Sequence, residues 1–242
     1  MKLVAKTLYG MEDVLIKELT ELGAKNIEKG NRVVTYVGDK RLLYASNLWL
    51  RTAISVLLPI QNFRFRDEKD LYAQFAKINF SEYMKVNQTF AVKGAVNSKL
   101  FNHTGYPRLV LKDAIADHFR DKFDKRPSVD LEKPQILFDI HIEENQCTVS
   151  LNSSGAPLFQ RGYRQGTGEA PINEVVAAGL IYLSGWDQKS NFIDVTCGSG
   201  TIPIEAALMA NGIPPNIARK SYSFQYWYDY DQQLWEDIYS KA

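Results

Sequence analysis

The first 64 residues switch repeatedly between two spacings of hydrophobic and polar positions. In some stretches apolar and polar residues alternate, as in half-buried strands; in others apolar residues recur every three or four positions, as on one face of a helix. The pattern predicts a strand at 2–7, a helix at 11–23, a hairpin at 26–38, a helix at 39–53 and a strand at 55–63. We place the hairpin turn at 29–31 because Gly30 can adopt the positive φ of a tight turn. The order βαββαβ predicts a ferredoxin-like α+β domain over residues 1–64.

Residues 65–155 contain a second series of periodic stretches. Leu71, Phe75 and Ile78 share a helical face, and a longer helical stripe ends before Pro127, which cannot continue a helix. Near the end of the segment, apolar and polar residues alternate on both sides of a turn at 143–146, a pattern typical of a hairpin with one buried face. The order ααβαββ predicts a second α+β domain.

Glycine and proline are concentrated between Ser153 and Pro171, where four glycines and two prolines occur. Such a composition favours turns and loops, and we interpret residues 156–170 as a linker. In residues 171–242 an apolar helix ends at Gly185, and a short strand is predicted over 191–195. The string TCGSG and a helical run over 201–210 follow. Strand, glycine turn and helix in this order form the first unit of a nucleotide-type α/β fold.

Composition narrows the class of protein. No run of about 18 apolar residues is present and the N-terminus lacks the order of a secretory signal, so we expect a soluble cytoplasmic protein. The two cysteines, Cys147 and Cys197, have no spacing typical of a zinc site or a disulfide framework, and we expect no metal. The net charge of +1 hides an asymmetry, because residues 1–158 hold 23 Lys and Arg against 19 Asp and Glu, whereas residues 159–242 hold 6 against 9. This weakly favours an anionic partner such as nucleic acid for the front part.

The glycine turn excludes two common cofactor classes. A Walker phosphate loop requires lysine after its last glycine, and none follows Gly200. The dinucleotide fingerprint would require glycine where the chain has Pro203. A helix N-terminus preceded by glycines still offers free N–H groups and close backbone approach to an anionic or polar cofactor.

The remaining pattern, D-x-x-C-G-S-G-T, resembles the first motif of class I S-adenosylmethionine-dependent methyltransferases, in the branch that methylates exocyclic amino groups of bases. The resemblance implies the incomplete start of a Rossmann-like α/β fold and S-adenosylmethionine as cofactor. It implies that Asp194 lies near the methionine ammonium group and that the turn backbone passes the methionine and ribose. The implied cofactor residues are Asp194, Thr196, Cys197, Gly198, Ser199, Gly200, Thr201, Glu205 and Pro171. Cys197 also has a reading as a nucleophile, but a small buried side chain fits its place in the turn better.

The segment LFQRGYRQGTGEAPINEVVAAGLI is similar to the one before this motif in the THUMP-containing 23S rRNA guanine-N2 methyltransferases. The resemblance identifies residues 65–155 as a THUMP domain, which binds structured RNA, and implies ribosomal RNA as the partner. Cations, hydrogen-bond donors and an aromatic residue suited to phosphate, sugar and base contacts are present in this domain and beside the cofactor site. The expected RNA contacts are Lys93, Lys99, His103, Tyr106, Arg108, Lys112, Arg161 and Arg164. Arg161, Tyr163, Arg164 and Pro171 are also expected as neighbours of the cofactor site, although a plain solvated linker would contain the same residues.

The sequence departs from the family pattern after the glycine turn. The branch carries a [DNS]-P-P-[YFW] tetrapeptide that holds the target base, and the nearest string, IPPN at 213–216, has neither the acceptor nor the aromatic. Only 42 residues follow Gly200, and we expect their many aromatics to have nothing yet to pack on. Asp229 and Asp231 lie too far along to hold the ribose and are expected on a helical insert. The catalytic residues are therefore unassigned, and we expect the start of a catalytic domain without turnover of its own.

Two other classes of function stay open at this point. One is an RNA-binding module without catalysis, and the other is a nicotinamide-dependent oxidoreductase, which Pro203 disfavours. A tRNA substrate is also compatible with the sequence, which does not identify the modified nucleotide.

Overall fold

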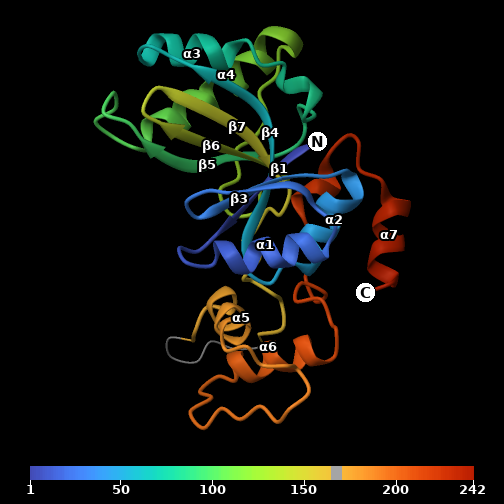
Figure 1. Cartoon of the computed structure of the whole chain (residues 1–242). Helices are drawn as coiled ribbons and strands as arrows, with labels where there is room; N and C mark the ends of the chain where they lie inside the picture. Colours follow the sequence, from blue (N-terminus) through green and yellow to red (C-terminus); the bar gives the residue numbers. More distant parts are fainter. Residues whose placement is uncertain (165–170) are drawn as a thin grey trace. The chain divides into compact units, whose positions relative to one another are not determined.

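The computed structural model of the chain describes residues 1–164 and 171–242 (Figure 1). They divide into two compact units. Unit 1 contains Met1–Val56, Ala156–Ser221 and Asp231–Ala242, and unit 2 contains Leu57–Gly155 and Tyr222–Tyr230. The last six residues of the predicted linker, 165–170, lie outside the described part of the chain.

The front of unit 1 has the predicted βαββαβ order. Its elements are β1 (Lys2–Thr7), α1 (Glu12–Glu21), β2 (Lys25–Lys29), β3 (Val33–Val37), α2 (Lys40–Trp49) and β4 (Ala53–Arg64), of which Ala53–Val56 belong to unit 1. The strand order β2-β3-β1-β4, with β1 antiparallel to β3 and β3 to β2, is that of a ferredoxin-like domain. Alternate residues of β1 and β3, among them Leu3 and Tyr36, are fully buried. The α+β prediction for this segment is confirmed.

The hairpin turn between β2 and β3 uses its glycine differently from the prediction. The positive φ of 58° lies at Arg32, not at Gly30. A Cβ on Gly30 would lie 2.7 Å from Cγ2 of Val33, so glycine is needed there for close approach. The sequence therefore indicated correctly that Gly30 matters in this turn, but the physical reason is the close approach of Val33 and not a positive φ.

The remainder of unit 1 is helical. It contains α5 (Glu174–Leu183), α6 (Thr201–Ala210) and α7 (Gln232–Ser240). Helix α5 approaches α1 closely, because a Cβ on Gly179 would lie 2.3 Å from Sδ of Met11, the residue before α1. Helix α7 packs on α2, with an edge-on contact of Tyr44 and Trp235 at 6.2 Å. Both helices are thus attached to the ferredoxin-like domain.

Residues 191–195, predicted as a strand, do not form one. They belong to no ladder among the described residues, and the side chains of Ile193 and Val195 are 80% and 89% exposed. A strand is stable only when a neighbour pairs with its backbone, and local sequence does not supply that neighbour. The strand prediction is therefore wrong for this structure.

Unit 2 has the predicted ααβαββ order. Its elements are α3 (Glu68–Ala76), the short 3-10 helix η1 (Phe80–Glu82), β5 (Phe90–Asn97), α4 (Tyr106–Phe123), β6 (Ile136–Glu143) and β7 (Gln146–Asn152), joined by the 3-10 helix η2 (Ser223–Tyr226). The sheet runs β4-β7-β6-β5, with β5 parallel to β6 and the other pairs antiparallel. Phenylalanines from α3, α4, η1 and the strands form its core, including Phe75, Phe80 and Phe138.

The aromatic segment 222–230 packs into unit 2, although we expected it to have no partner. Phe224 is fully buried and its N–H donates to the carbonyl of Ser153 at 3.0 Å. Ser223 Oγ donates to the carbonyl of Gln135 at 2.6 Å, and Trp227 packs against the apolar core. The expectation was wrong because it considered only packing partners near the segment in sequence, whereas the segment packs on residues that are distant in sequence. Asp231 caps α7, since its Oδ1 accepts from the Leu234 N–H at 3.0 Å, whereas Asp229 lies just before this helix.

Candidate cofactor site

Two glycines with positive φ bend the backbone immediately before α6. Gly198 has φ 53° and Gly200 has φ 75°, and Gly200 is the cap residue from which α6 begins at Thr201. The Gly200 N–H donates to the Cys197 carbonyl at 2.8 Å and closes the turn. The Cys197 side chain is exposed, which corrects our expectation of a buried one; nothing in the described residues packs over the turn. The first N–H groups of α6 are directed to this turn, as an anionic or polar ligand would require.

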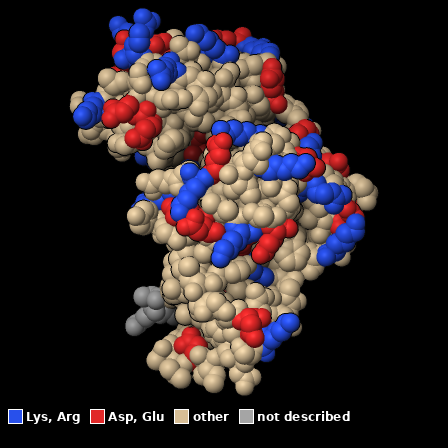
Figure 2. Space-filling view, viewed as in Figure 1, with Lys and Arg blue, Asp and Glu red and all other residues tan. Residues whose placement is uncertain are grey.

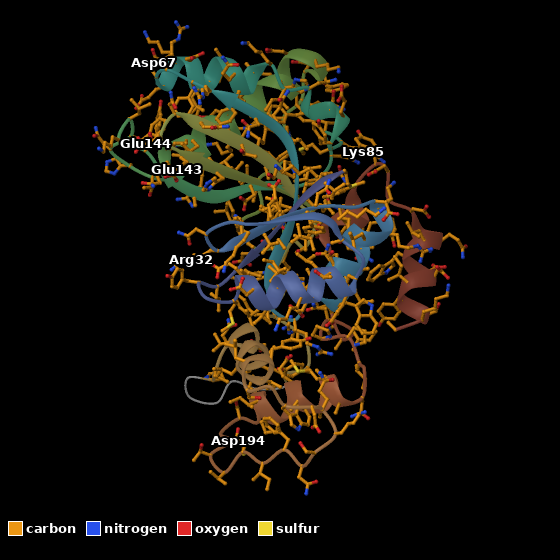
Figure 3. All side chains as sticks on the ribbon, in the orientation of Figure 1. Arg32, Asp67, Lys85, Glu143, Glu144 and Asp194 are labelled. Atoms are coloured by element: carbon orange, nitrogen blue, oxygen red, sulfur yellow. The ribbon has the colours of Figure 1, made fainter. Side chains whose placement is uncertain are left out.

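Asp194 lies in the loop that leads into this turn (Figure 3). Its Oδ1 accepts from the Thr196 N–H at 3.0 Å, which holds the carboxylate against the turn backbone. Among the described residues Oδ2 has no hydrogen-bond partner. A fixed, half-exposed carboxylate beside side-chain-free backbone fits a ligand that carries an ammonium group.

Arg164 connects the linker to the first residue of α6. Its Nη2 donates to Thr201 Oγ1 at 3.0 Å and to the carbonyl of Ile172 at 2.9 Å, and its Nε pairs with Glu174. Thr201 Oγ1 also lies 3.2 Å from Ser199 Oγ in the turn. Arg164 thus lies beside the candidate cofactor turn, with Nε and Nη2 bound to protein groups, and its role as an RNA contact stays a prediction.

Pro171 is exposed and lines a cavity of about 430 Å³ together with Arg164 and Glu174. It therefore lies near Arg164, no described contact joins it to the glycine turn, and its expected place beside the cofactor stays a prediction.

Glu205 and Arg161 are buried, which corrects both of their expected roles. Both side chains are 0% exposed, and Arg161 Nε lies 3.4 Å from Glu205 Oε1. The same oxygen accepts from the Tyr163 hydroxyl at 3.1 Å. Arg161 cannot contact RNA from this position, and Glu205 faces these partners and not the turn.

Sequence analysis missed Arg51, which completes this buried cluster. Its Nη1 lies 4.0 Å from Glu205 Oε2, and its carbonyl accepts from Arg161 Nη2. Burial lowers the pKa of Arg51 and raises the pKa of Glu18, whose carboxylate accepts from the N–H groups of Arg51 and Thr52 at 2.7 and 3.0 Å. A signal was present, because Arg51 interrupts an apolar stretch and Glu18 lies on the apolar face of its helix.

The six expected RNA contacts in unit 2 come from one strand, one loop and one helix. Lys93 is on β5, the last strand of the sheet, Lys99 and His103 are in the following loop, and Tyr106, Arg108 and Lys112 are on α4. Arg108 and Lys112 are half-buried, and Lys112 Nζ lies 3.0 Å from Asp113. On the face shown in Figure 2, Lys and Arg side chains are interspersed with Asp and Glu.

Within residues 1–164 and 171–242, no three His, Cys, Asp or Glu side chains are grouped as metal ligands would be. No helix in these residues is long and apolar enough to cross a membrane.

Three domain families match successive parts of the chain. Residues 2–57 match the RlmL ferredoxin-like domain, residues 65–152 the THUMP domain and residues 161–240 the RMKL-like methyltransferase domain. Together they leave only short stretches of the chain unmatched.

Similar proteins carry the same arrangement. The chain is 38% identical over 238 residues to a protein of Synechocystis described as a putative RNA methyltransferase, slr0064, and covers 62% of its length. A crystal structure from Listeria monocytogenes, described as a predicted N6-adenine-specific DNA methylase, is 29% identical with a TM-score of 0.87. It covers 100% of this chain, which spans 63% of it. SMU.472, described as a putative methyltransferase complexed with SAH, is 29% identical with a TM-score of 0.85, over 99% of this chain and 63% of that one.

Proposed function

The chain carries the domain combination of the THUMP-containing RNA methylases, and on that premise we propose that the whole protein transfers a methyl group from S-adenosylmethionine to RNA. We propose further that the acceptor is an exocyclic amine of guanine in 23S ribosomal RNA. The observation that carries the proposal is the turn at Gly198 and Gly200 between a fixed carboxylate and the start of α6. The described residues of this turn fit the cofactor in backbone shape and in charge.

The roles of the residues follow from charge and backbone geometry. Bound here, S-adenosylmethionine would supply the methyl group from its sulfonium centre. Asp194 would pair through its free oxygen with the ammonium group of the methionine moiety. Gly198 and Gly200 leave the backbone open to close approach, and the N-terminus of α6 favours polar and anionic groups nearby. Thr196, Cys197, Ser199 and Thr201 contribute backbone or side-chain surface to the same turn.

RNA binding is proposed for unit 2, which contains all of residues 65–155. Lys93, Lys99 and His103 are exposed on an edge strand and the loop after it, where phosphate groups can reach them. Because [DNS]-P-P-[YFW] does not occur in residues 1–242, we expect these residues alone to bind without turnover. Methyl incorporation into ribosomal RNA by the purified chain would contradict that expectation.

Cys197 provides a direct test of the cofactor site. Its thiol is exposed in the turn, whereas Cys147 is buried and burial raises its pKa to about 12. Alkylation of the folded chain therefore reports on Cys197 alone. We expect S-adenosylhomocysteine to slow this alkylation in a saturable way, and Asp194→Asn to weaken the protection by about tenfold or more, since it removes one charge-assisted contact.

Asp187→Asn is the matched control, because this exposed acid lies in the same loop but binds only its own turn. Protection that is equal in Asp194→Asn and in the unchanged chain would sink the assignment of Asp194. No protection at all, together with RNA affinity that falls steeply with salt, would support a non-catalytic RNA-binding module instead. Competition between ribosomal RNA and tRNA in the same binding assay distinguishes the two RNA classes.

A further inference from the structure

Helix α6, which begins at the glycine turn, has a small apolar interface. Ala206 and Met209 of this helix are buried against Ala178 and Ile181 of α5, and four partly buried side chains pack around them: Tyr182, Trp186, Phe192 and Ile202. The fully buried part of this interface consists of two alanines, one methionine and one isoleucine, so it contributes only a modest share of the packing that fixes α6. The helix is nevertheless held by polar groups along its whole length.

Two of these groups act at the N-terminal turn and the middle of α6. Arg164 binds Thr201 at the first residue, at 3.0 Å. One turn later, Arg161 and Tyr163 bind Glu205 Oε1, at 3.4 and 3.1 Å. All three partners come from residues 161–164, at the start of the stretch that matches the methyltransferase domain.

The third group, Arg51, acts at the C-terminal end and comes from the ferredoxin-like domain. Its Nη2 donates to the carbonyl of Ile213, just beyond α6, at 2.6 Å, and to that of Leu208 in the last turn at 3.4 Å, which also accepts from the Ile213 N–H at 2.8 Å. Its Nη1 faces Glu205 Oε2 at 4.0 Å, and neither atom has a hydrogen-bond partner in the described residues. Arg51 therefore places its positive charge at the C-terminal end of α6 and beside a buried carboxylate at the same time.

Removal of one partner from such a cluster is costly. The Glu205 side chain is 0% exposed and that of Arg51 is 6% exposed, so water does not compensate for a lost partner. Without Arg51, Arg161 still pairs with Oε1, but Oε2 loses the cation that faces it, and an incompletely paired buried carboxylate destabilises its surroundings. Here the destabilisation would affect α6, the helix that begins at the candidate cofactor turn.

We propose that Arg51, a residue of the ferredoxin-like domain, is a positioning residue for the cofactor turn and acts through Glu205 and the C-terminal end of α6. The ferredoxin-like domain is then a structural part of the cofactor site and not only a companion of the RNA-binding unit. This inference rests on the proposed cofactor role of the turn. It predicts that loss of Arg51 loosens the turn from a distance, without any contact to the ligand.

Hydrogen–deuterium exchange of the full chain without cofactor tests the proposal. In Arg51→Met we expect amides in 198–210 to exchange at least about tenfold faster, which corresponds to ~1.4 kcal/mol of local opening free energy. Arg51→Lys keeps the charge but not the forked donors, and we expect an intermediate rate. S-adenosylhomocysteine protection of Cys197 is expected to weaken in the same order.

Val34→Ala is the control, because Val34 is buried in β3 of the same unit and has no part in the polar contacts that hold α6. We expect it to lower the thermal midpoint of unit 1 without selectively faster exchange at 198–210. If Arg51→Met accelerates exchange evenly across unit 1, as Val34→Ala does, or leaves 198–210 unchanged, the proposal is overturned. If Arg51→Met does not fold, Glu205→Gln is measured in the same way; it removes the pairs of Glu205 with both Arg51 and Arg161, and we expect faster exchange at 198–210. If the unchanged chain does not bind S-adenosylhomocysteine, the proposed function fails. Hydrogen–deuterium exchange at 198–210 still decides whether Arg51 positions the turn.

Discussion

At the residue scale, a single carboxylate shapes the loop between α5 and the glycine turn. Asp187 Oδ1 accepts from the N–H groups of Lys189 and Ser190 at 3.0 and 2.8 Å, and from the Ser190 hydroxyl at 2.8 Å. The N–H of Ser190 is the main cause that lowers the pKa of Asp187 to about 2, and the N–H of Lys189 and the Ser190 hydroxyl contribute. The carboxylate is exposed, so the local turn and not burial sets its charge state.

This pKa shift predicts a pH dependence. The pKa of Asp187 is lower in the folded chain than the ordinary value near ~3.9, so its stabilisation of the loop is present above about pH 4 and is lost as pH falls towards 2. Asp187→Asn keeps the accepting oxygen but does not titrate, and we expect the exchange protection of Lys189 and Ser190 to lose its acid dependence. Carboxyl NMR titration gives the midpoint directly. A midpoint near 4 would show that the capping contacts do not persist in solution.

At the element scale, the parallel pairing of β5 and β6 depends on one glycine. Gly94 lies opposite Ile140 with φ 144°, and a Cβ at this position would lie 1.9 Å from the Ile140 carbonyl oxygen. Both the backbone conformation and the available space therefore exclude a side chain.

Gly94→Ala is accordingly expected to destabilise unit 2 by about 3 kcal/mol or more, because the strand has to shift or separate. Chemical denaturation followed through β-sheet circular dichroism measures the loss. Ala95→Gly, at the next and exposed position, is the matched control and is expected to cost only about 0.5–1 kcal/mol. Similar costs for the two variants would mean that the sheet accommodates a side chain at Gly94.

Elements were predictable from sequence where their cause is local. The helices around Leu15 and Phe75 and the hairpin of β6 and β7 follow from apolar spacing and turn residues, and all three are present. The strand at 191–195 was predicted wrongly, because its existence depends on a neighbouring strand and not on its own residues. In the candidate site, the glycine turn was visible as a motif, whereas Arg51 reaches α6 only through the tertiary fold.

At the scale of the whole molecule, the units are not consecutive in sequence. Residues 222–230 lie within the stretch that matches the methyltransferase domain, yet they pack in unit 2. Phe224 is the anchor: it is fully buried and its ring stacks on Tyr222 with centroids 5.2 Å apart. Lys85 of unit 2 also lies 5.4 Å from the ring centre of Tyr228.

We therefore expect Phe224→Ala to destabilise unit 2, by about 3–5 kcal/mol, although the residue is distant from residues 57–155 in sequence. Faster amide exchange in β6 and β7 is the measurement. Phe123→Ala, which removes a 44% exposed ring from the same unit, is expected to cost about 1 kcal/mol or less. Unchanged exchange in Phe224→Ala would show that unit 2 does not need the returning segment.

The return of residues 222–230 sets a condition for domain transplantation. In a chimaera that exchanges only residues 57–155 with those of a relative, the native segment 222–230 would have to pack on a foreign sheet. Phe224 would then lie against residues that differ from its native neighbours. Recombination within this architecture has to carry both stretches together. The aromatic residues of segment 222–230 are then transferred together with the residues on which they pack.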